Sequence, residues 1–505
     1  MKKYSQVKAG IVFSYLLIII NALYGVVITP YIINQLGMDE YGVYKTIGSL
    51  TASLIVIDLG IGGTVQRYVA KYIAEKQNEK ISNFIAMNLI QAAFMSGVLI
   101  VVCLFLFFSI DSVYGESFSI NQIETAQIVF FVLSISMIIQ FFSDVLNGVI
   151  VGYNHFAFGN GIKLAQIIVR IILVYVVLLR WKSAVALALI DLLLIIIVIV
   201  IQRIYISFKL KQKIKLTKWE NSVFFDAGKY TLLMFITSLV SQINTNADNV
   251  IVGALSGPSY VAIYSIGLLF FGMFQSLSGA VAGVMLPTVT NALQKENGLD
   301  DVIDIVVRAG RFQFALIGAG IIGFIFLGED FINVWLGSDY SDAYIITLIL
   351  VVPSVFELCI NVCLSILRAQ NKLGFRTIVI SISAVLNIII TIIAVKNWCY
   401  IGAAIGTAFS YLVCSLIVMN VYYVKVIKLP MILIYKRIVK GIWECLLVAG
   451  VVLLFSSMFL YGSYLRIILN VVIFCVVYGV MLLCFGLERK EKEQISVVKN
   501  IIKKK

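Results

Sequence analysis

Charged side chains are scarce in this sequence of 505 residues, where they make up 13% against 61% for hydrophobic residues. A soluble protein of this length carries roughly a quarter charged residues and could not hide so much apolar surface in one core. A bilayer accepts that surface, because a membrane helix satisfies its own backbone and turns its side chains to lipid. The composition, with a mean hydropathy of +1.02, therefore indicates an all-α integral membrane protein.

Histidine and paired cysteines are also nearly missing. The only histidine is His155, so we expect neither a histidine-based metal site nor a catalytic triad. The eight cysteines form no CxxC pair, which argues against a zinc site or a disulfide framework. Gly318, Gly320 and Gly323 follow no strand and precede no Lys-Ser/Thr pair, so they favour close helix packing over ATP binding. No cofactor is expected.

Long apolar runs fill most of the chain. A hydrocarbon core of about 30 Å requires about 20 apolar residues per helix. Fourteen stretches meet that standard: 10–33, 43–65, 84–108, 123–151, 162–179, 184–206, 230–255, 260–285, 312–335, 343–366, 377–395, 401–424, 438–459 and 467–487. The first resembles a signal sequence, but it is too long and lacks a cleavage motif, so we expect a retained helix.

Basic residues are concentrated in alternate loops. The net charge of +13 therefore determines membrane orientation and does not indicate nucleic-acid binding. If the N-terminus is cytoplasmic, nearly all lysines and arginines fall on the cytoplasmic side. The opposite side has only Lys45, Arg180, Lys182, Lys396 and Arg466, and its loops 34–42, 110–122, 256–259 and 336–342 contain none. The pattern predicts that both termini are cytoplasmic and that the number of helices is even.

The longest polar stretch, near 206–226, divides the chain into groups of helices. The expected regions are 1–206 (N-lobe, helices 1–6), 207–229 (cytoplasmic basic linker), 230–426 (C-lobe, helices 7–12), 427–488 (helices 13–14) and 489–505 (charged cytoplasmic tail). The segments 36–44 and 255–264 are weakly alike, each with a leucine at a helix end, a tight turn and two tyrosines entering the next helix. Six helices per half would make this a parallel repeat.

Two short motifs resemble a known family. The run Leu36-Gly37…Tyr41-Gly42…Asp58-Leu59-Gly60…Arg67…Ala70 resembles the N-terminal signature of the Wzx-type polysaccharide-export flippases. Asp248-Asn249-Val250-Ile251-Val252-Gly253, followed by Tyr264-Ser265, is similar to their seventh-helix segment. These flippases belong to the multidrug/oligosaccharidyl-lipid/polysaccharide (MOP) exporter superfamily.

The resemblance implies two six-helix lobes that form a V-shaped central cavity, plus two C-terminal helices that form a groove for a polyprenyl tail. It further implies a non-enzymatic flippase in a bacterial cytoplasmic membrane. The cargo would be undecaprenyl-pyrophosphate-linked oligosaccharide repeat units, moved by alternating access for O-antigen, capsule or exopolysaccharide assembly. Membrane lipids, a polysaccharide polymerase and chain-length machinery are the implied partners.

Arg170 lies near the middle of the fifth apolar span. A lone arginine there would cost roughly 3 kcal/mol on insertion scales, so we expect it to face protein or water. One interpretation is that it lines the cavity and binds pyrophosphate, because a guanidinium group matches two phosphate oxygens at once. The other is a structural ion pair with Asp144 or Asp191.

Acidic residues also fall inside the apolar spans. They are Asp58, Asp144, Asp191, Asp248, Glu357 and Glu444. Coupling to a proton or sodium gradient would need at least one acid that changes state, and the first five are the candidates. Each of them has an alternative role as a hydrogen-bond partner between helices.

Basic residues at helix ends complete the candidate set. Lys45, Arg67, Lys229 and Arg311 join Arg170 as candidates to bind an anionic head group, and Arg308 lies at a similar position. The simpler interpretation is that these side chains snorkel and set orientation. The lysine run 209–218 alternates with apolar residues and either lies on anionic lipid or acts only as a topology determinant.

Three alternatives remain open. A multidrug exporter of the same superfamily would share the fold, although twelve helices and organic cations are usual for that group. A lipid II flippase would share fourteen helices and differ in its N-terminal motif. A membrane glycosyltransferase or polymerase would use Asp39 and Glu40 as a catalytic acidic pair, but the exterior loops are about ten residues or fewer, apart from 110–122.

Overall fold

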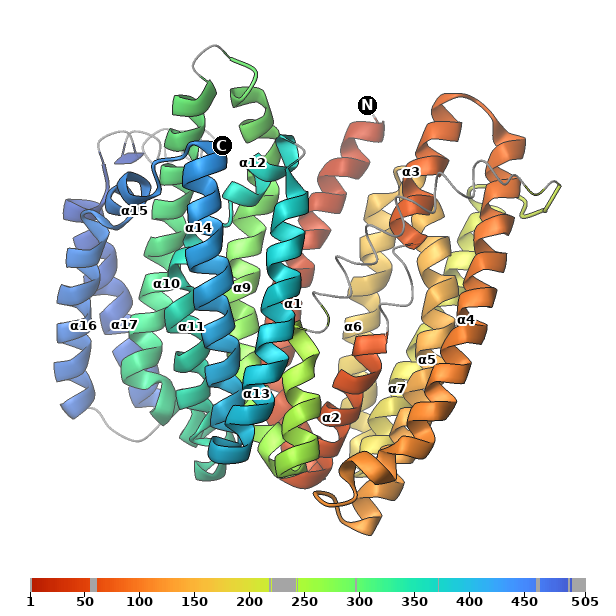
Figure 1. Ribbon diagram of the computed structural model, residues 1–505, viewed down its shortest axis with the longest axis horizontal. Helices are drawn as coiled ribbons and strands as arrows, with labels where there is room; N and C mark the ends of the chain where they lie inside the picture. The colour runs from red at the N-terminus through yellow and green to blue at the C-terminus, as the bar shows by residue number, and fades with distance from the viewer. Residues whose placement is uncertain are drawn as a thin grey trace. The chain divides into compact units, whose positions relative to one another are not determined.

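The computed structural model describes residues 2–54, 61–217, 219, 242, 244–295, 298–370, 372–459, 464–488 and 491–492. All regular structure in these ranges is helical (Figure 1). The chain divides into two compact units. Unit 1 contains Met1–Ser265 with Ile388–Ala403, and unit 2 contains Ile266–Asn387 with Ala404–Lys505.

Unit 1 consists mainly of seven labelled helices. They are α1 (Lys2–Leu36), α2 (Met38–Leu54), α3 (Ile61–Ala74), α4 (Asn78–Tyr114), α5 (Ile120–Gly152), α6 (Phe156–Leu178) and α7 (Ala184–Phe208). Residues 244–256 are also helical. Helix α5 packs against α2, α3, α4 and α7, and α1 packs against α6 (Figure 1).

Local sequence explains where several of these helices begin and end. Gly37 separates α1 from α2 with a φ of 81°, a left-handed conformation that glycine adopts without a steric penalty. Ser119 and Gln122 form a capping box that starts α5. Glu40 accepts hydrogen bonds from Ser183 Oγ at 2.9 Å and Ala184 N at 3.0 Å, placing a carboxylate at the positive end of α7.

Close helix packing in unit 1 depends on small residues. A Cβ added at Gly42 of α2 would lie 1.8 Å from the carbonyl oxygen of Pro258. A Cβ at Gly148 of α5 would lie 2.5 Å from the carbonyl oxygen of Gly62 on α3. Between these helices lies a buried apolar core that includes Ile47. The interior of unit 1 is therefore packed through backbone-to-backbone approaches, as is usual in membranes.

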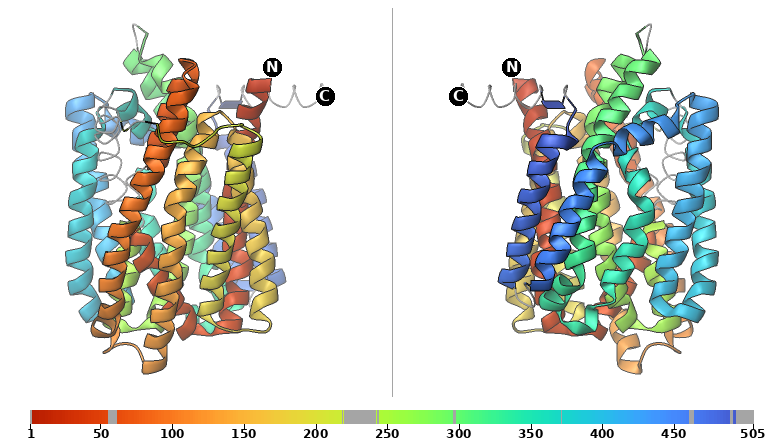
Figure 2. Two further views of the ribbon diagram at one scale, coloured as in Figure 1. Left: turned by 90° about the vertical axis from the view of Figure 1, so that its right-hand side faces the viewer. Right: turned by 90° about the vertical axis from the view of Figure 1, so that its left-hand side faces the viewer.

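Unit 2 contains most of the remaining elements, although α9 (Pro258–Ala292) begins in unit 1 and residues 388–403 of α13 belong to unit 1. They are α10 (Gly298–Leu336), the 3₁₀ turn η2 (Ser338–Tyr340), α11 (Ala343–Cys359), α12 (Cys363–Ala369), α13 (Leu373–Ser410), the π-helices η3 (Tyr411–Val418), η4 (Tyr423–Ile427) and η5 (Leu482–Gly486), and α14 (Met419–Tyr422), α15 (Met431–Val439), α16 (Ile442–Phe459) and α17 (Tyr464–Met481). Helix α10 packs against α11, α15, α16 and α17, and α16 lies beside α17 (Figure 2).

Among the described residues, ten helices are long and apolar enough to cross a membrane, or up to eleven if the bent pair α15–α16 is one span. One of the ten runs over 55 residues, Leu373–Ile427. Non-helical backbone at Trp398 and Cys399 divides that run, which at 1.5 Å per residue would otherwise extend about 80 Å. The multi-span, all-α expectation is confirmed. The number fourteen and the limits of the expected regions stay predictions.

Candidate functional site

A cluster of polar and charged side chains lies inside unit 1 around Arg170, which α6 provides. Arg170 Nε donates to Asp191 Oδ1 on α7 at 2.6 Å, and Nη2 donates to Asp191 Oδ2 at 3.1 Å. Nη2 also donates to Tyr44 Oη on α2 at 3.0 Å, and Nη1 donates to Tyr24 Oη on α1. Tyr44 Oη in turn donates to Asp191 Oδ2 at 2.8 Å. Four helices thus converge on one guanidinium group.

Lys45 adds a second cation to this cluster. Its Nζ lies 5.4 Å from the ring centroid of Tyr41, and the charges of Arg170 and Asp191 act on it. The guanidinium carbon of Arg170 lies 5.1 Å from the ring centroid of Tyr24, within the range of a cation–π interaction. We name Tyr24, Tyr41, Tyr44, Lys45, Arg170 and Asp191 the Arg170 cluster.

The charge of the Arg170 cluster is positive, because two cations oppose one carboxylate. The side chains of Arg170 and Asp191 are 21% and 25% exposed, so the ion pair is not fully buried. The bidentate contact holds the guanidinium plane in a fixed direction. A membrane-embedded site with fixed donors and an excess positive charge is suited to an anion.

Of the two acids considered as ion-pair partners of Arg170, Asp191 makes the contact. Asp144 accepts instead from Gln140 Nε2 at 2.8 Å, one helical turn away on α5. The two tyrosine hydroxyls that complete the cluster were missed in the sequence. The signal available there was the Tyr44-Lys45 pair inside an apolar span, which places a hydroxyl and an ammonium group on the same helix.

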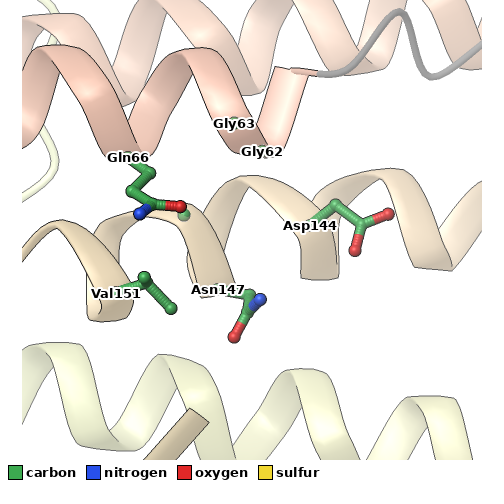
Figure 3. Close-up of a pocket in the computed structure, with 7 residues that line it drawn as sticks. Gly62, Gly63, Gln66, Asp144, Asn147 and Val151 are labelled. Carbon is green, nitrogen blue, oxygen red and sulfur yellow. The ribbon is translucent and has the colours of Figure 1, made fainter. Parts of the chain in front are cut away.

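A polar pocket lies between α3 and α5 in the same unit (Figure 3). Its volume is about 280 Å³, and it is lined by Gly62, Gly63, Gln66, Asp144, Asn147, Gly148 and Val151. The side chains of Gln66 and Asn147 extend from the two facing helices, with Asp144 one turn further along α5 (Figure 3). A carboxylate and two amides offer both donors and acceptors, which are the partners that hydroxyl groups require.

Two further acids in the expected ion-coupling set have protein partners. Asp248, which is 2% exposed, accepts from Tyr264 Oη at 2.6 Å and from Thr391 Oγ1 at 3.3 Å. These contacts join the helical residues 244–256 to α9 and α13 within unit 1. In unit 2, Glu357 is hydrogen-bonded by Ser415 and lies within the electrostatic reach of Arg376.

Arg311 occupies a different environment from the one expected. It lies in the interior of α10, which begins at Gly298, so the expectation that Arg311 lies at a helix end is wrong. Arg311 is 2% exposed. Its donors reach the carbonyl oxygens of Arg437 (2.9 Å), Lys440 (2.7 Å) and Gly486 (2.7 Å). Both carboxylate oxygens of Glu491 accept the remaining bonds. These bonds stabilise unit 2 and leave no N–H of Arg311 for a substrate.

The other expected site residues are not brought together. Arg67 is exposed on α3. Asp58 and Lys229 lie outside the residues that the structure describes. Glu444 is an exposed residue in the first turn of α16, where a carboxylate complements the helix dipole.

The remaining sequence candidates have structural contacts. Asp39 accepts from Gln122 Nε2 at 3.2 Å and from Ser259 Oγ, while Glu40 caps α7, so this acidic pair ties helix ends together. His155 Nδ1 is hydrogen-bonded to Tyr205 Oη at 2.6 Å. Burial and the nearby Lys209 charge lower the pKa of His155.

The fold is shared with solved MOP-type transporters. It resembles the lipid II flippase MurJ in an inward closed conformation with a TM-score of 0.70 and 17% identity, over 93% of this chain and 97% of that one. An inward-facing multidrug resistance MATE family transporter of the MOP superfamily gives 0.57 and 16% identity, over 80% of this chain and 98% of that one. At these identities the likeness shows the fold alone.

Relatives by sequence cover the chain unevenly. The probable low-salt glycan biosynthesis flippase Agl15 of Haloferax volcanii is 22% identical over 55% of this chain. The putative O-antigen transporter of Salmonella typhi is 22% identical over 81% of this chain and 94% of its own length. The Bacillus subtilis membrane protein EpsK is 23% identical over 64% of this chain. The matches span 57% of Agl15 and 64% of EpsK.

A family match settles the relationship. Residues 7–293, more than half of the 505 residues, match the family described as polysaccharide biosynthesis protein. The earlier resemblance to polysaccharide-export proteins is thereby confirmed, and the chain belongs to the polysaccharide biosynthesis protein family.

Proposed function

We propose that this protein is a flippase that moves a polyprenyl-pyrophosphate-linked oligosaccharide repeat unit across the bacterial cytoplasmic membrane. The observation that carries the proposal is the Arg170 cluster, which gathers two cations, three tyrosines and one carboxylate within unit 1. The names of the glycan flippase and O-antigen transporter relatives support the cargo class.

The cluster would bind the pyrophosphate of the cargo. Asp191 and the tyrosine hydroxyls orient the guanidinium of Arg170 before any cargo arrives, so less entropy is lost on binding. Pyrophosphate replaces or joins the Asp191 carboxylate on the guanidinium, and Lys45 supplies the second positive charge. This contact reduces the cost of carrying a charged head group through the hydrocarbon region. Arg67 and Lys229 stay secondary candidates, and Arg311 is left out because its donors are occupied.

The polar pocket between α3 and α5 would take part of the sugar. Its amide and carboxylate groups match hydroxyls, and a volume of about 280 Å³ is near the lower limit for small-molecule sites. Coupling to a proton or sodium gradient would use Asp144, Asp191, Asp248, Glu357 or Asp58. We assign no enzymatic step to this chain. Access to the site alternates between the two sides of the membrane, both termini are cytoplasmic, and a polysaccharide polymerase and its chain-length machinery act downstream.

The test is the location of the lipid-linked oligosaccharide in a strain that lacks this gene but retains glycan synthesis. Accumulation facing the cytoplasm, with loss of surface polysaccharide, supports flipping. Accumulation of completed single repeats facing outward would instead indicate a polymerase, and an unchanged pool would direct attention to drug efflux. The MurJ and MATE likenesses keep a lipid II flippase and a multidrug exporter as alternatives. Accumulation of inward-facing lipid II would support the first of these.

A further inference from the structure

The basic segment that follows α7 has no regular secondary structure but is held by hydrogen bonds. Residues 211–217 are neither helix nor turn, and they run beside the start of α4 at the end of unit 1 where α3 meets α4 (Figures 1 and 2). Ser82 Oγ donates to the carbonyl oxygen of Lys213 at 2.8 Å and accepts from Lys215 N at 3.0 Å. Thr217 N donates to Asn83 Oδ1 at 2.8 Å. Side chains of α4 therefore bind the backbone of this segment directly.

Alternate side chains of this segment point in different directions. Leu210 and Ile214 pack against the buried core of unit 1, and Gln212 accepts a hydrogen bond from Tyr153 Oη at 2.8 Å. The intervening side chains are all exposed, and they are Lys209, Lys211, Lys213 and Lys215. We name these four residues the lysine row.

Large apolar side chains are exposed on both sides of the lysine row. Phe208 at the end of α7 is 79% exposed, Leu216 is 44% exposed and Trp219 is 41% exposed. Exposed aromatic and aliphatic groups next to lysines are typical of segments that lie in a membrane interface. An acidic protein surface would match the lysines but would gain less from these apolar groups.

We propose that the lysine row is a binding surface for anionic phospholipid head groups of the cytoplasmic leaflet. Phe208, Leu216 and Trp219 reach the acyl boundary while the ammonium groups contact phosphate. A topology determinant needs only positive charge near a helix end, whereas this segment has a defined conformation that α4 maintains. The proposal is independent of the cargo, because none of its residues belongs to the Arg170 cluster.

The lysine row can be removed without losing the contacts that hold the segment. The bonds to Ser82 are made by backbone atoms of Lys213 and Lys215, so glutamine at these positions keeps them. The test variant is K209Q/K211Q/K213Q/K215Q in the full-length protein. A matched control, K425Q/K428Q/K436Q/K440Q, removes the same charge from four exposed lysines of unit 2.

The experiment compares thermal unfolding of purified protein in detergent with added phosphatidylglycerol or phosphatidylcholine. Phosphatidylglycerol should raise the Tm of the wild-type protein and the control more than phosphatidylcholine does. The test variant should require at least about tenfold more phosphatidylglycerol for the same rise, because each lysine near an anionic surface contributes to binding. Its Tm in phosphatidylcholine should equal that of the wild type. High salt should reduce the difference between the lipids.

Three results would overturn the proposal. The first is an unchanged phosphatidylglycerol response in the test variant. The second is an equal loss in the control variant, which would show that overall charge alone is sensed. The third is binding of an acidic peptide such as poly-glutamate to the lysine row that phosphatidylglycerol fails to displace, which would indicate a protein partner.

Discussion

Arg170 makes a structural ion pair and also belongs to a cluster with a net positive charge. Its ion pair with Asp191 offsets much of the cost of placing an arginine in the membrane, while Lys45 leaves the cluster with an excess cation. The sequence identified Arg170 because charges are rare in apolar spans. It could not choose between Asp144 and Asp191, because only the packing of α6 against α7 decides which carboxylate comes near.

The role of Arg170 can be separated from the role of the ion pair. The exchange R170D/D191R keeps a pair between α6 and α7 but moves the cation to the other helix. We predict that this variant inserts into the membrane at wild-type levels and does not restore surface polysaccharide in the deletion strain. Membrane fractions and surface glycan, measured together, provide the test. Full export by the exchanged variant would show that the pair serves only packing.

The matched variant is R170K, which keeps the charge but loses the forked donors. Lysine cannot make the bidentate contact, and a lost hydrogen bond to a charged group costs about 1.5–3 kcal/mol, so export should fall about tenfold or more. Export rates in the complemented strain check this value. A rate equal to that of the wild type would mean that a point charge is sufficient at this position.

At the scale of single helices, the helix ends in the structure differ from the ends of the apolar stretches in the sequence. The apolar stretch 84–108 lies inside the longer α4, Asn78–Tyr114, because polar residues continue the helix beyond the hydrocarbon region. For the same reason α10 begins at Gly298 and makes Arg311 an interior residue. The hydropathy of the sequence indicates which part of a helix lies in lipid, but it does not indicate where the helical backbone hydrogen bonds end.

Glycine positions in α2 provide an element-scale prediction. A Cβ at Gly42 would lie 1.8 Å from a backbone carbonyl oxygen, whereas nothing lies within 4 Å of a Cβ at Gly48. G42A should lower the Tm, since overpacking typically costs about 1–3 kcal/mol. G48A should leave the Tm unchanged or raise it, because alanine favours a helix over glycine by up to about 1 kcal/mol. Thermal unfolding of both purified variants tests this prediction. Equal Tm values for G42A and G48A would contradict the close approach of α2 to Pro258.

At the scale of the whole molecule, composition and two short motifs were sufficient to predict the all-helical membrane fold and the family. The likeness to MurJ over 93% of the chain and the family match of residues 7–293 confirm both predictions. The Tyr24 and Tyr44 contacts and the pocket at Asn147 were not predictable, because they depend on which helices pack side by side. The orientation of the chain in the membrane stays a prediction from its basic loops.

Native cysteines can test that orientation. Cys399, at the kink of α13, and Cys484, in η5, are both exposed; the expected topology places Cys399 in an exterior loop and Cys484 near the cytoplasmic end of the last span. A membrane-impermeant maleimide should label Cys399 in intact cells and Cys484 only after permeabilisation. The variants C399S and C484S identify each labelled site. Labelling of Cys484 in intact cells would invert the proposed orientation.

Transport by the purified protein tests the central claim most directly. The protein is reconstituted into liposomes that contain a fluorescent polyprenyl-pyrophosphate-linked oligosaccharide, and an impermeant quencher then reports the share of lipid that reaches the outer leaflet. We predict that the wild-type protein makes the inner pool accessible without ATP, and that R170D/D191R leaves it as inaccessible as in protein-free liposomes. The account would be contradicted if the wild-type protein transported lipid II or an organic cation in such liposomes but left the labelled lipid of the inner leaflet inaccessible to the quencher.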